Sequence, residues 1–228
     1  MSKELKSLLK KAQSNNATDR YSAVVDIADL AEREAIEPLI GMIHDPDDDV
    51  KLVVATTLGF LGERFKDSTP VPALIDMLKN SGDNAYLKQY IIEGLGKIGD
   101  PEVGRLLADL IEVEESNPDI LKEIITAIGL TKYKPAGKRI VKYLDHDEET
   151  VKLATAQALG DVGDSSCLDA LFEAANGVSS DVAGNAIISI GKIGDRSSLD
   201  QLFLMLDAEP PLTKILERAV RDAIDMIK

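Results

Sequence analysis

A glycine-rich segment of this chain contains residue types that bind nucleotides in other proteins. Residues 94–99 follow the pattern Gly-x-Gly-x-x-Gly, which is typical of dinucleotide-binding loops. That pattern must follow a strand and open a helix, so that the phosphates meet the helix N-terminus. Here an apolar, helix-like stretch precedes the glycines. The segment is therefore typical of a helix end, and we predict no cofactor.

The acidic segment 45–49 begins like a calcium-binding loop, with acids at its first, third and fifth positions. The sixth position of such a loop is glycine and the twelfth is a bidentate glutamate, but this chain has Val50 and Thr56 there. Carboxylates at a helix start also cap free backbone N–H groups. We interpret the segment as a helix cap and predict no metal site.

Histidine and cysteine are too scarce to build a catalytic centre. The chain has two histidines, His44 and His146, and one cysteine, Cys167. None of them forms a recognisable nucleophile and base pair, and they are too few for a histidine-rich metal centre. Cys167 has no second cysteine to bond with, so we expect a structural role for it rather than a redox role. The sequence predicts no catalytic residues and favours a protein that is not an enzyme.

A basic and aromatic cluster is the strongest candidate for a binding site. It places five basic residues and two tyrosines in twelve positions: Lys132, Tyr133, Lys134, Lys138, Arg139, Lys142 and Tyr143. Arginine and tyrosine are enriched at the energetic centres of protein interfaces. Ile140, Val141 and Leu144 form an apolar helical stripe, so we expect the remaining side chains of residues 138–143 to point outward. The alternative is that these cations only balance nearby acids and a helix C-terminus.

The long connection at residues 63–72 is the second candidate. It contains Phe65 and two prolines, and it lengthens one repeat unit. Insertions in repeat proteins map to one face, often the binding face. The sequence therefore indicates Phe65 as a partner-binding residue. The alternative is that Phe65 and Val71 fold back onto their own repeat.

These candidate residues are carried by a tandem repeat. The phrase Gly-x-x-Gly recurs at 59–62, 96–99, 160–163 and 191–194, each time after an apolar stretch. Apolar residues stand immediately before it, or at the matching position of the other units: Ile27, Leu58, Leu95, Ile128, Leu159, Ile190 and Ile224. Further apolar residues lie four and eight positions earlier, which predicts one face of a helix. A second apolar pair, twelve and sixteen positions later, predicts a second helix.

Turn chemistry agrees with these helical hairpins. A glycine of the phrase can adopt the left-handed conformation that ends the first helix, and Asp100, Asp164 and Asp195 are placed to cap the second. The acidic turns 45–49 and 145–149 are placed to cap the next hairpin. A small residue precedes each apolar anchor and lets adjacent helices approach closely. These residues are Thr57, Gly94, Ala127, Ala158, Ser189 and Ala223.

The sequence therefore predicts an all-α fold, an α-solenoid of about six helical hairpins with a capping helix at each end. We expect one domain over residues 1–228, with an N-terminal cap at 1–17, six repeats at 18–212 and a C-terminal cap at 213–228. Such repeats cannot bury an apolar face alone and must stack on their neighbours.

Charge and hydropathy exclude several partner classes. The chain has 26 Lys and Arg against 40 Asp and Glu, a formal net charge of −14, which repels nucleic-acid phosphates. It lacks a continuous apolar run long enough to span a bilayer, and its first residues are charged where a signal peptide is apolar. We expect a cytoplasmic protein that binds neither nucleic acid nor membrane.

Two helices in about 31 residues with Gly-x-x-Gly-Asp between them resemble the short HEAT repeats shared with phycobilin lyase subunits, known as PBS-lyase HEAT-like repeats. A lysine near the start of the first helix, as at Lys51, Lys88 and Lys152, strengthens the resemblance. The fourth unit departs from it at residues 131–133. The resemblance implies that the second helices line a concave face, which would hold the basic cluster.

The sequence favours a function in binding rather than in catalysis, because an extended solenoid supplies a large surface and the basic cluster can orient a partner on it. We expect a scaffold, adaptor or regulatory subunit that docks a protein or peptide on its curved surface, without a small-molecule ligand. The alternative is a subunit similar to bilin lyases, which handle a linear tetrapyrrole on a phycobiliprotein. The cluster would then hold the pigment's propionates.

Overall fold

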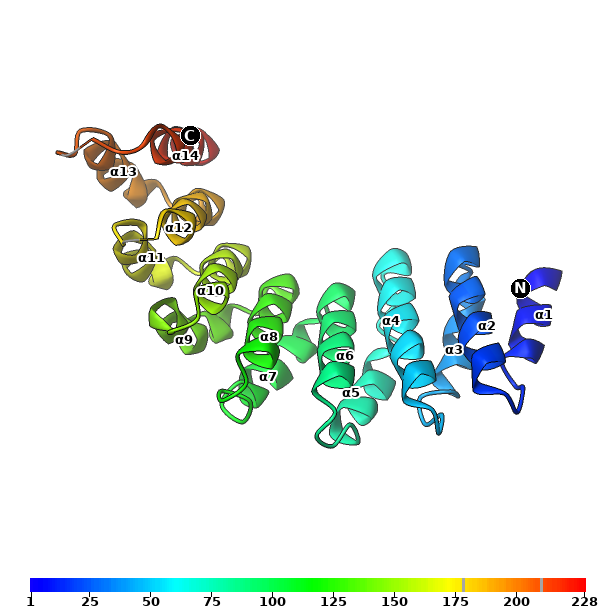
Figure 1. Cartoon of the computed structure of the whole chain (residues 1–228). Coiled ribbons are helices and arrows are strands. Elements are labelled where there is room, and N and C mark those ends of the chain that lie inside the picture. The colour runs from blue at the N-terminus through cyan, green and yellow to red at the C-terminus, as the bar shows by residue number, and fades with distance from the viewer. Residues whose placement is uncertain (178, 210) are drawn as a thin grey trace. The chain divides into compact units, whose positions relative to one another are not determined.

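The structure is a computed structural model that describes residues 1–177, 179–209 and 211–228 (Figure 1). Residues 178 and 210 fall within the predicted repeat region and lie outside the described residues. The described residues form helices and connections without any strand. Long and short helices alternate along the chain from α2 to α13. The predicted all-α solenoid fold is therefore confirmed.

The chain divides into two compact units, Met1–Val103 and Gly104–Lys228. The helices of the first unit are α1 (Lys3–Lys11), α2 (Ala17–Leu30), α3 (Ile36–Ile40), α4 (Asp48–Phe65), α5 (Val71–Lys79) and α6 (Ala85–Ile98). Helix α7 (Pro101–Leu110) begins at the end of this unit. The division does not test the single domain expected over residues 1–228, which stays a prediction.

The second unit continues with α8 (Pro118–Thr131), α9 (Gly137–Ile140), α10 (Glu149–Val162), α11 (Leu168–Ala175), α12 (Ser180–Ile193), α13 (Leu199–Leu206) and α14 (Lys214–Ile227). Short 3-10 turns precede several of the short helices, and one of them, Val141–Asp145, follows α9.

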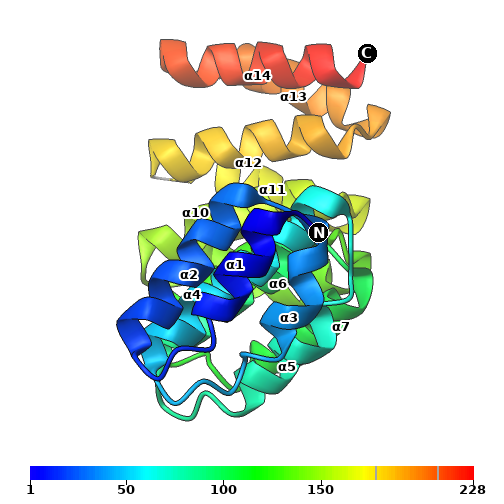
Figure 2. The ribbon, with the colours of Figure 1, turned by 90° about the vertical axis from the view of Figure 1, so that its right-hand side faces the viewer.

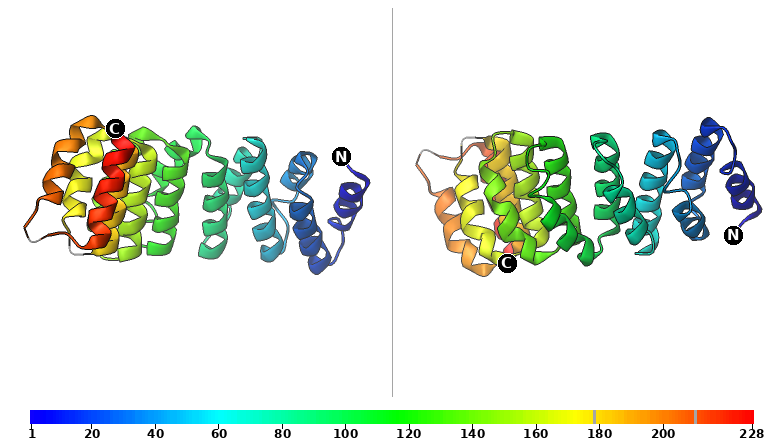
Figure 3. Two further views of the ribbon diagram at one scale, coloured as in Figure 1. Left: turned by 90° about the horizontal axis from the view of Figure 1, so that it is seen from above. Right: turned by 90° about the horizontal axis from the view of Figure 1, so that it is seen from below.

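Each unit has two layers. In the first unit, α1, α2, α4 and α6 pack on one another in chain order, and α3 and α5 pack against α4 and α6. In the second, α8, α10, α12 and α14 form the row, and α9, α11 and α13 form the other layer. Figure 2 shows α12 beneath α14, with α13 partly behind α14. Figure 3 shows the helices of each unit side by side. The buried core between the layers is mainly Leu, Ile, Val and Ala.

The second glycine of the repeated phrase ends the long helix. Gly99, Gly163 and Gly194 have φ of 72°, 69° and 71°, a left-handed conformation that glycine adopts without a steric cost. Each of their N–H groups donates to the carbonyl four residues earlier. This confirms the predicted helix stop.

The first glycine has a different role, which is close helix packing. A Cβ built on Gly160 would lie 2.5 Å from the Oγ of Ser189, and one on Gly191 would lie 2.8 Å from the Cα of Ala223. One on Gly129 would lie 2.9 Å from the Cα of Ala158. The small residues before the anchors therefore do let neighbouring long helices approach closely, as predicted.

Most of the predicted caps are present. Asp100, Asp164 and Asp195 each accept a hydrogen bond from the N–H two residues later, at 2.9 to 3.0 Å. Asp47 caps α4 by accepting from the N–H groups of Asp49 and Val50. These carboxylates satisfy backbone donors that a helix start leaves without intrahelical partners.

Two of the turn predictions are wrong. The acidic turn before α10 provides no carboxylate cap, because the Glu148 N–H donates instead to the Nδ1 of His146 at 3.0 Å. The phrase at 59–62 does not end its helix either. Gly62 packs against Ile98, and α4 continues to Phe65 before it ends at Lys66, which has a left-handed φ of 52°.

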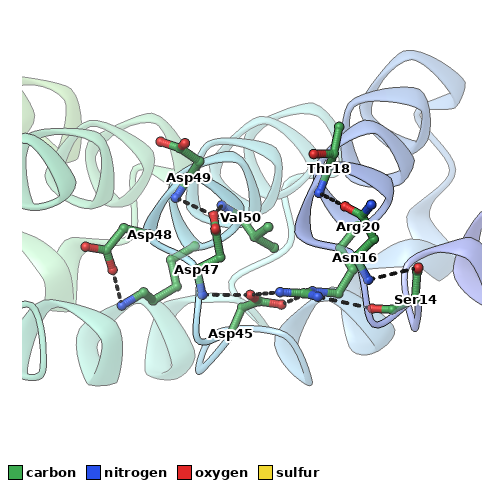
Figure 4. A network of polar contacts seen from close by, with 10 residues as sticks. Ser14, Asn16, Thr18, Arg20, Asp45, Asp47, Asp48, Asp49 and Val50 are labelled. Atoms are coloured by element: carbon green, nitrogen blue, oxygen red, sulfur yellow. Dashed lines mark hydrogen bonds and ion pairs between the residues drawn. The ribbon is translucent and has the colours of Figure 1, made fainter.

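Two ion pairs with largely buried aspartates join segments of the first unit, one of them with an exposed arginine (Figure 4 shows the other). Arg20 donates from Nε and Nη2 to both carboxylate oxygens of Asp45 at 2.7 Å, and from Nη1 to the carbonyl of Ser14. Arg33 donates from Nε to Asp67 at 2.8 Å. Both aspartates are largely buried, so these contacts fix the loops around α2 and α4.

None of the helices in the described part of the chain is both long enough and apolar enough to cross a bilayer.

Candidate partner-binding surface

The basic cluster lies in the second unit, on the segment that joins α8 to α10. Lys132 is the left-handed residue after α8, with φ of 53°, in the place where three other units have glycine. Lys134 lies in a 3-10 turn, Lys138 and Arg139 lie in α9, and Lys142 lies in the 3-10 turn after it. The fourth unit's departure from the repeated phrase therefore adds a cation at a helix end.

Three of the lysines are uncompensated. Lys132, Lys134 and Lys138 are exposed. In the part of the chain that the structure describes, none of the three forms an ion pair with a carboxylate. Their ammonium groups are therefore accessible to an acidic group of another molecule. We call these three residues the free-lysine surface.

The other two cations are neutralised by acids of the preceding repeat. Arg139 donates from Nη1 to Asp109 at 2.7 Å and from Nη2 to Glu112 at 3.1 Å. The hydrogen bond from Arg139 to Asp109 is the main reason that the pKa of Arg139 is raised. Lys142 donates to Glu115 at 2.9 Å, and this contact lowers the pKa of Glu115. For these two residues the alternative interpretation, a balance of nearby charges, describes the structure.

Tyr143 does not point outward, so that expectation is wrong. Its side chain is only 3% exposed, and burial raises the pKa of its phenol. The cause is the 3-10 geometry of Val141–Asp145, in which residues three apart share a face. Tyr143 therefore lies on the same buried face as Ile140. Val141, which was expected on that face, is half-exposed. In a regular α-helix Tyr143 would lie at the edge of the stripe formed by Ile140, Val141 and Leu144, which is why it was expected to point outward.

Tyr133 is half-buried and packs against α7. A Cβ built on Gly104 would lie 2.3 Å from the Cβ of Tyr133 and 2.4 Å from the Oγ1 of Thr131. The tyrosine thus fills the space that the glycine leaves. The residue remains partly exposed, and it adjoins Lys132 and Lys134 in the sequence.

Phe65 lies apart from the cluster, since it ends α4 in the first unit. It is half-buried, and the guanidinium carbon of Arg64 lies 5.8 Å from its ring centroid. The connection after it is held by Asp67, which also accepts hydrogen bonds from the backbone and side chain of Thr69. These contacts give the connection a structural role, and its role in binding stays a prediction.

The expected concave placement of the cluster is wrong within the second unit. The row of α8, α10, α12 and α14 follows the inner side of that unit's bend, and α9, α11 and α13 lie on its outer side (Figure 1). The physical reason is the contact of glycines with small residues, which brings the long helices closer together than the short ones. The free-lysine surface therefore belongs to the outer layer.

Sequence analysis missed an acidic groove in the second unit. It has a volume of about 610 Å³ and a floor that includes Leu144, Ala174 and Val182. Its rim carries one lysine and several carboxylates: Asp145, Asp147, Glu149, Glu173 and Lys152. The acids of residues 145–149 were interpreted only as caps. One sequence signal could have indicated the groove. Residues 145–149 contain four acidic residues, which is more than the capping of one helix requires.

The fold and these surfaces define a helical repeat protein of the α-solenoid class. Residues 5–85 and 137–221, more than half of the chain, match the family of HEAT repeats, and the chain belongs to that family. The family resemblance drawn from the sequence is therefore confirmed. No curated protein sequence matches the chain.

Several solved structures are similar to the chain at low identity. The complex of CpcE and CpcF of phycocyanin lyase from Nostoc sp. PCC7120 has a TM-score of 0.61 and 17% identity, with 98% of this chain and 94% of that chain covered. YibA of Escherichia coli has a TM-score of 0.65 and 17% identity, with 98% and 81% covered. An archaeal HEAT-like repeats protein from Thermococcus onnurineus NA1 has a TM-score of 0.59 and 14% identity, with 100% and 97% covered. At such identities the likeness shows the fold alone.

Proposed function

We propose that this chain is a non-enzymatic scaffold or adaptor of the cytoplasm that docks a protein or peptide through an acidic segment of that partner. The observation that carries the proposal is the free-lysine surface in a chain of net charge −14. Lys132, Lys134 and Lys138 are exposed, and none of them pairs with a carboxylate of the described residues. A local positive surface on an acidic protein attracts an acidic segment and repels most of the competing basic ones.

The neighbouring residues support this interpretation. Arg139 and Lys142 are held by the acids of the preceding repeat, which fixes the segment that carries the lysines. Tyr133 adds a half-exposed aromatic ring next to Lys132 and Lys134. A segment of this kind loses little backbone entropy on binding, because its backbone is already ordered.

The test uses charge reversal. The double variant Lys134→Glu, Lys138→Glu should weaken binding of a fluorescein-labelled octaglutamate peptide by about tenfold, because it replaces attraction by repulsion. A matched control, Lys6→Glu with Lys10→Glu, makes the same change in total charge on two exposed lysines of α1. Circular dichroism should be unchanged in both variants.

A natural partner is sought by affinity purification from the native host followed by mass spectrometry. The partner recovered should dissociate from the double variant and remain bound to the control. If both variants bind the peptide and the recovered partner as the original chain does, the proposal is wrong.

The second candidate function is a bilin lyase-like subunit that handles a tetrapyrrole on a phycobiliprotein. Its support is the fold likeness to the CpcE and CpcF complex, together with lysines that could pair with propionates. Adding phycocyanobilin to the purified chain tests this candidate. A shifted visible absorption spectrum that Lys134→Glu abolishes would favour the lyase-like function over the scaffold.

A further inference from the structure

The first unit carries a tyrosine groove on its row of long helices. The groove has a volume of about 430 Å³ and crosses α2, α4 and α6 near their N-terminal ends. Its lining is Ala17, Thr18, Tyr21, Asp47, Asp49, Leu52 and Tyr86. The groove is separate from the free-lysine surface and has the opposite charge.

The two tyrosines of the groove are exposed although they occupy a packed row of helices. Tyr21 is 41% exposed and Tyr86 is 60% exposed. Tyr86 is held in place by Tyr90, with ring centroids 4.9 Å apart, an interplanar angle of 69° and a hydroxyl separation of 3.1 Å. An edge-to-face pair of this kind fixes the orientation of the exposed ring. The ring of Tyr86 therefore presents a preorganised aromatic surface to the groove.

The carboxylates of the groove lie outside the ion pairs of the first unit. No basic side chain within the described ranges forms an ion pair with Asp47 or Asp49. Asp47 uses one carboxylate oxygen to cap α4, which leaves the other available. Figure 4 shows the carboxylate of Asp49 directed away from Arg20, which is engaged by Asp45. Asp47 interacts electrostatically with Arg20, whereas Asp49 has no cationic partner among the described residues. Two aromatic rings beside Asp49 are the kind of surroundings that attract a cation.

We propose that the tyrosine groove binds an arginine- or lysine-rich segment of a partner protein, with a cationic side chain between Tyr21 and Tyr86 and within reach of Asp49. Charge complementarity selects this occupant. The carboxylates attract the basic segment, the tyrosine faces attract its cation through the ring quadrupole, and Leu52 contacts its aliphatic stem. The half-buried Leu52 lines the same groove as the two tyrosines.

The direct test is fluorescence anisotropy with a labelled peptide of alternating lysine and arginine, eight residues long, against an octaglutamate peptide of the same length. Tyr86→Leu keeps apolar area and removes the aromatic face, and we expect it to weaken binding of the basic peptide at least about fivefold. Asp49→Asn should weaken it by a similar factor and make the remaining binding less sensitive to salt.

A matched control separates the site from the general negative charge. Asp119 occupies the same second position of α8 that Asp49 occupies in α4, and it is exposed in the second unit. Asp119→Asn therefore removes the same charge from the same helical position and should leave binding unchanged. Thermal unfolding of each variant shows that it is folded.

Two results would overturn the proposal. Equal loss of affinity in Asp49→Asn and Asp119→Asn, with none in Tyr86→Leu, would mean that the peptide only responds to net charge. In the second, spermine displaces the basic peptide when both are present at the same concentration of cationic groups. The groove would then be a site for small cations instead of a protein-docking site. Neither result bears on the free-lysine surface, whose probe is acidic.

Discussion

Gly59 of α4 and Gly94 of α6 are in backbone contact: a Cβ built on Gly59 would lie 2.4 Å from the Cα of Gly94. At this point two long helices touch without any side chain between them. Similar contacts recur in the second unit at Gly129, Gly160 and Gly191. The spacing of these long helices therefore depends on the first glycine of three repeated phrases, Gly59, Gly160 and Gly191, and on Gly129 at the matching position of the fourth unit.

Gly59→Ala should destabilise the first unit. The added methyl would meet backbone that cannot rotate away, so the helices must separate, at a cost of about 1–3 kcal/mol. Gly184→Ala is the matched control, because it lies inside α12 with only a Leu216 methyl at 3.8 Å. There alanine's helix propensity should stabilise by up to about 1 kcal/mol. Urea denaturation followed by circular dichroism measures both, and a stable Gly59→Ala would contradict the contact.

Lys132→Gly should stabilise the chain by about 1 kcal/mol. Lys132 has a left-handed φ of 53°, a conformation that costs an L-residue roughly 1–2 kcal/mol and costs glycine nothing. Lys152→Gly is the control within α10, where the same substitution should destabilise by about 1 kcal/mol through lost helix propensity. Differential scanning calorimetry compares the two. The same sign in both variants would refute the backbone argument.

Tyr143→Phe should not destabilise the protein. The Tyr143 hydroxyl is buried without a hydrogen-bond partner among the described residues. Removing such a group relieves a desolvation penalty of about 1–3 kcal/mol, partly offset by the small void left behind. Tyr143→Ala should instead cost about 3–5 kcal/mol, because it empties a packed site. Chemical denaturation measures the free energy of unfolding of both variants. If Tyr143 pointed outward, both values would be close to that of the original chain.

Arg20→Gln should lower the melting temperature by several degrees. Arg20 binds both oxygens of Asp45, and its removal leaves a largely buried carboxylate without its counter-ion. Arg221→Gln is the control, because Arg221 makes an exposed pair with Glu217 within α14. Exposed pairs of this kind contribute little to stability. Comparable melting temperatures for the two variants would show that the Arg20 pair is not an important connection.

Acid should destabilise the first unit through Asp45 and Asp67. Burial alone would raise the pKa of Asp45, but hydrogen bonds from Arg20 and the Asp47 N–H outweigh it and lower that pKa. The hydroxyl of Thr69 is the main cause of the lowered pKa of Asp67. A carboxyl whose pKa falls on folding contributes stability that is full above its unfolded value, near 4, and is lost as the pH drops through its folded value.

The measurement is the melting temperature between pH 7 and pH 3. We expect a decrease below about pH 4, and we expect Asp45→Asn to make the decrease shallower. Asp119→Asn serves as the control and should keep the original slope. A melting temperature that rises as the pH falls would reverse the sign of the argument.

Local residue patterns were sufficient for the fold. Helix periodicity, the left-handed glycines at 99, 163 and 194, and the aspartate caps at 100, 164 and 195 all operate within one or two turns of chain. Such local rules determine where helices begin and end, and the all-α repeat follows from them. The sequence also identified the residues of the basic cluster. A local excess of basic residues in an acidic chain can be seen without a structure.

The tertiary structure decided which of these residues are available to a partner. Arg139 and Lys142 are neutralised by acids 27 to 30 residues away, and the 3-10 turn rotates Tyr143 into the core. Tyr21 and Tyr86 meet in one groove although α4 separates them in the chain. The physical reason is that ion pairing, burial and grooves depend on neighbours from other repeats, and the packing distance between repeats determines which neighbours those are.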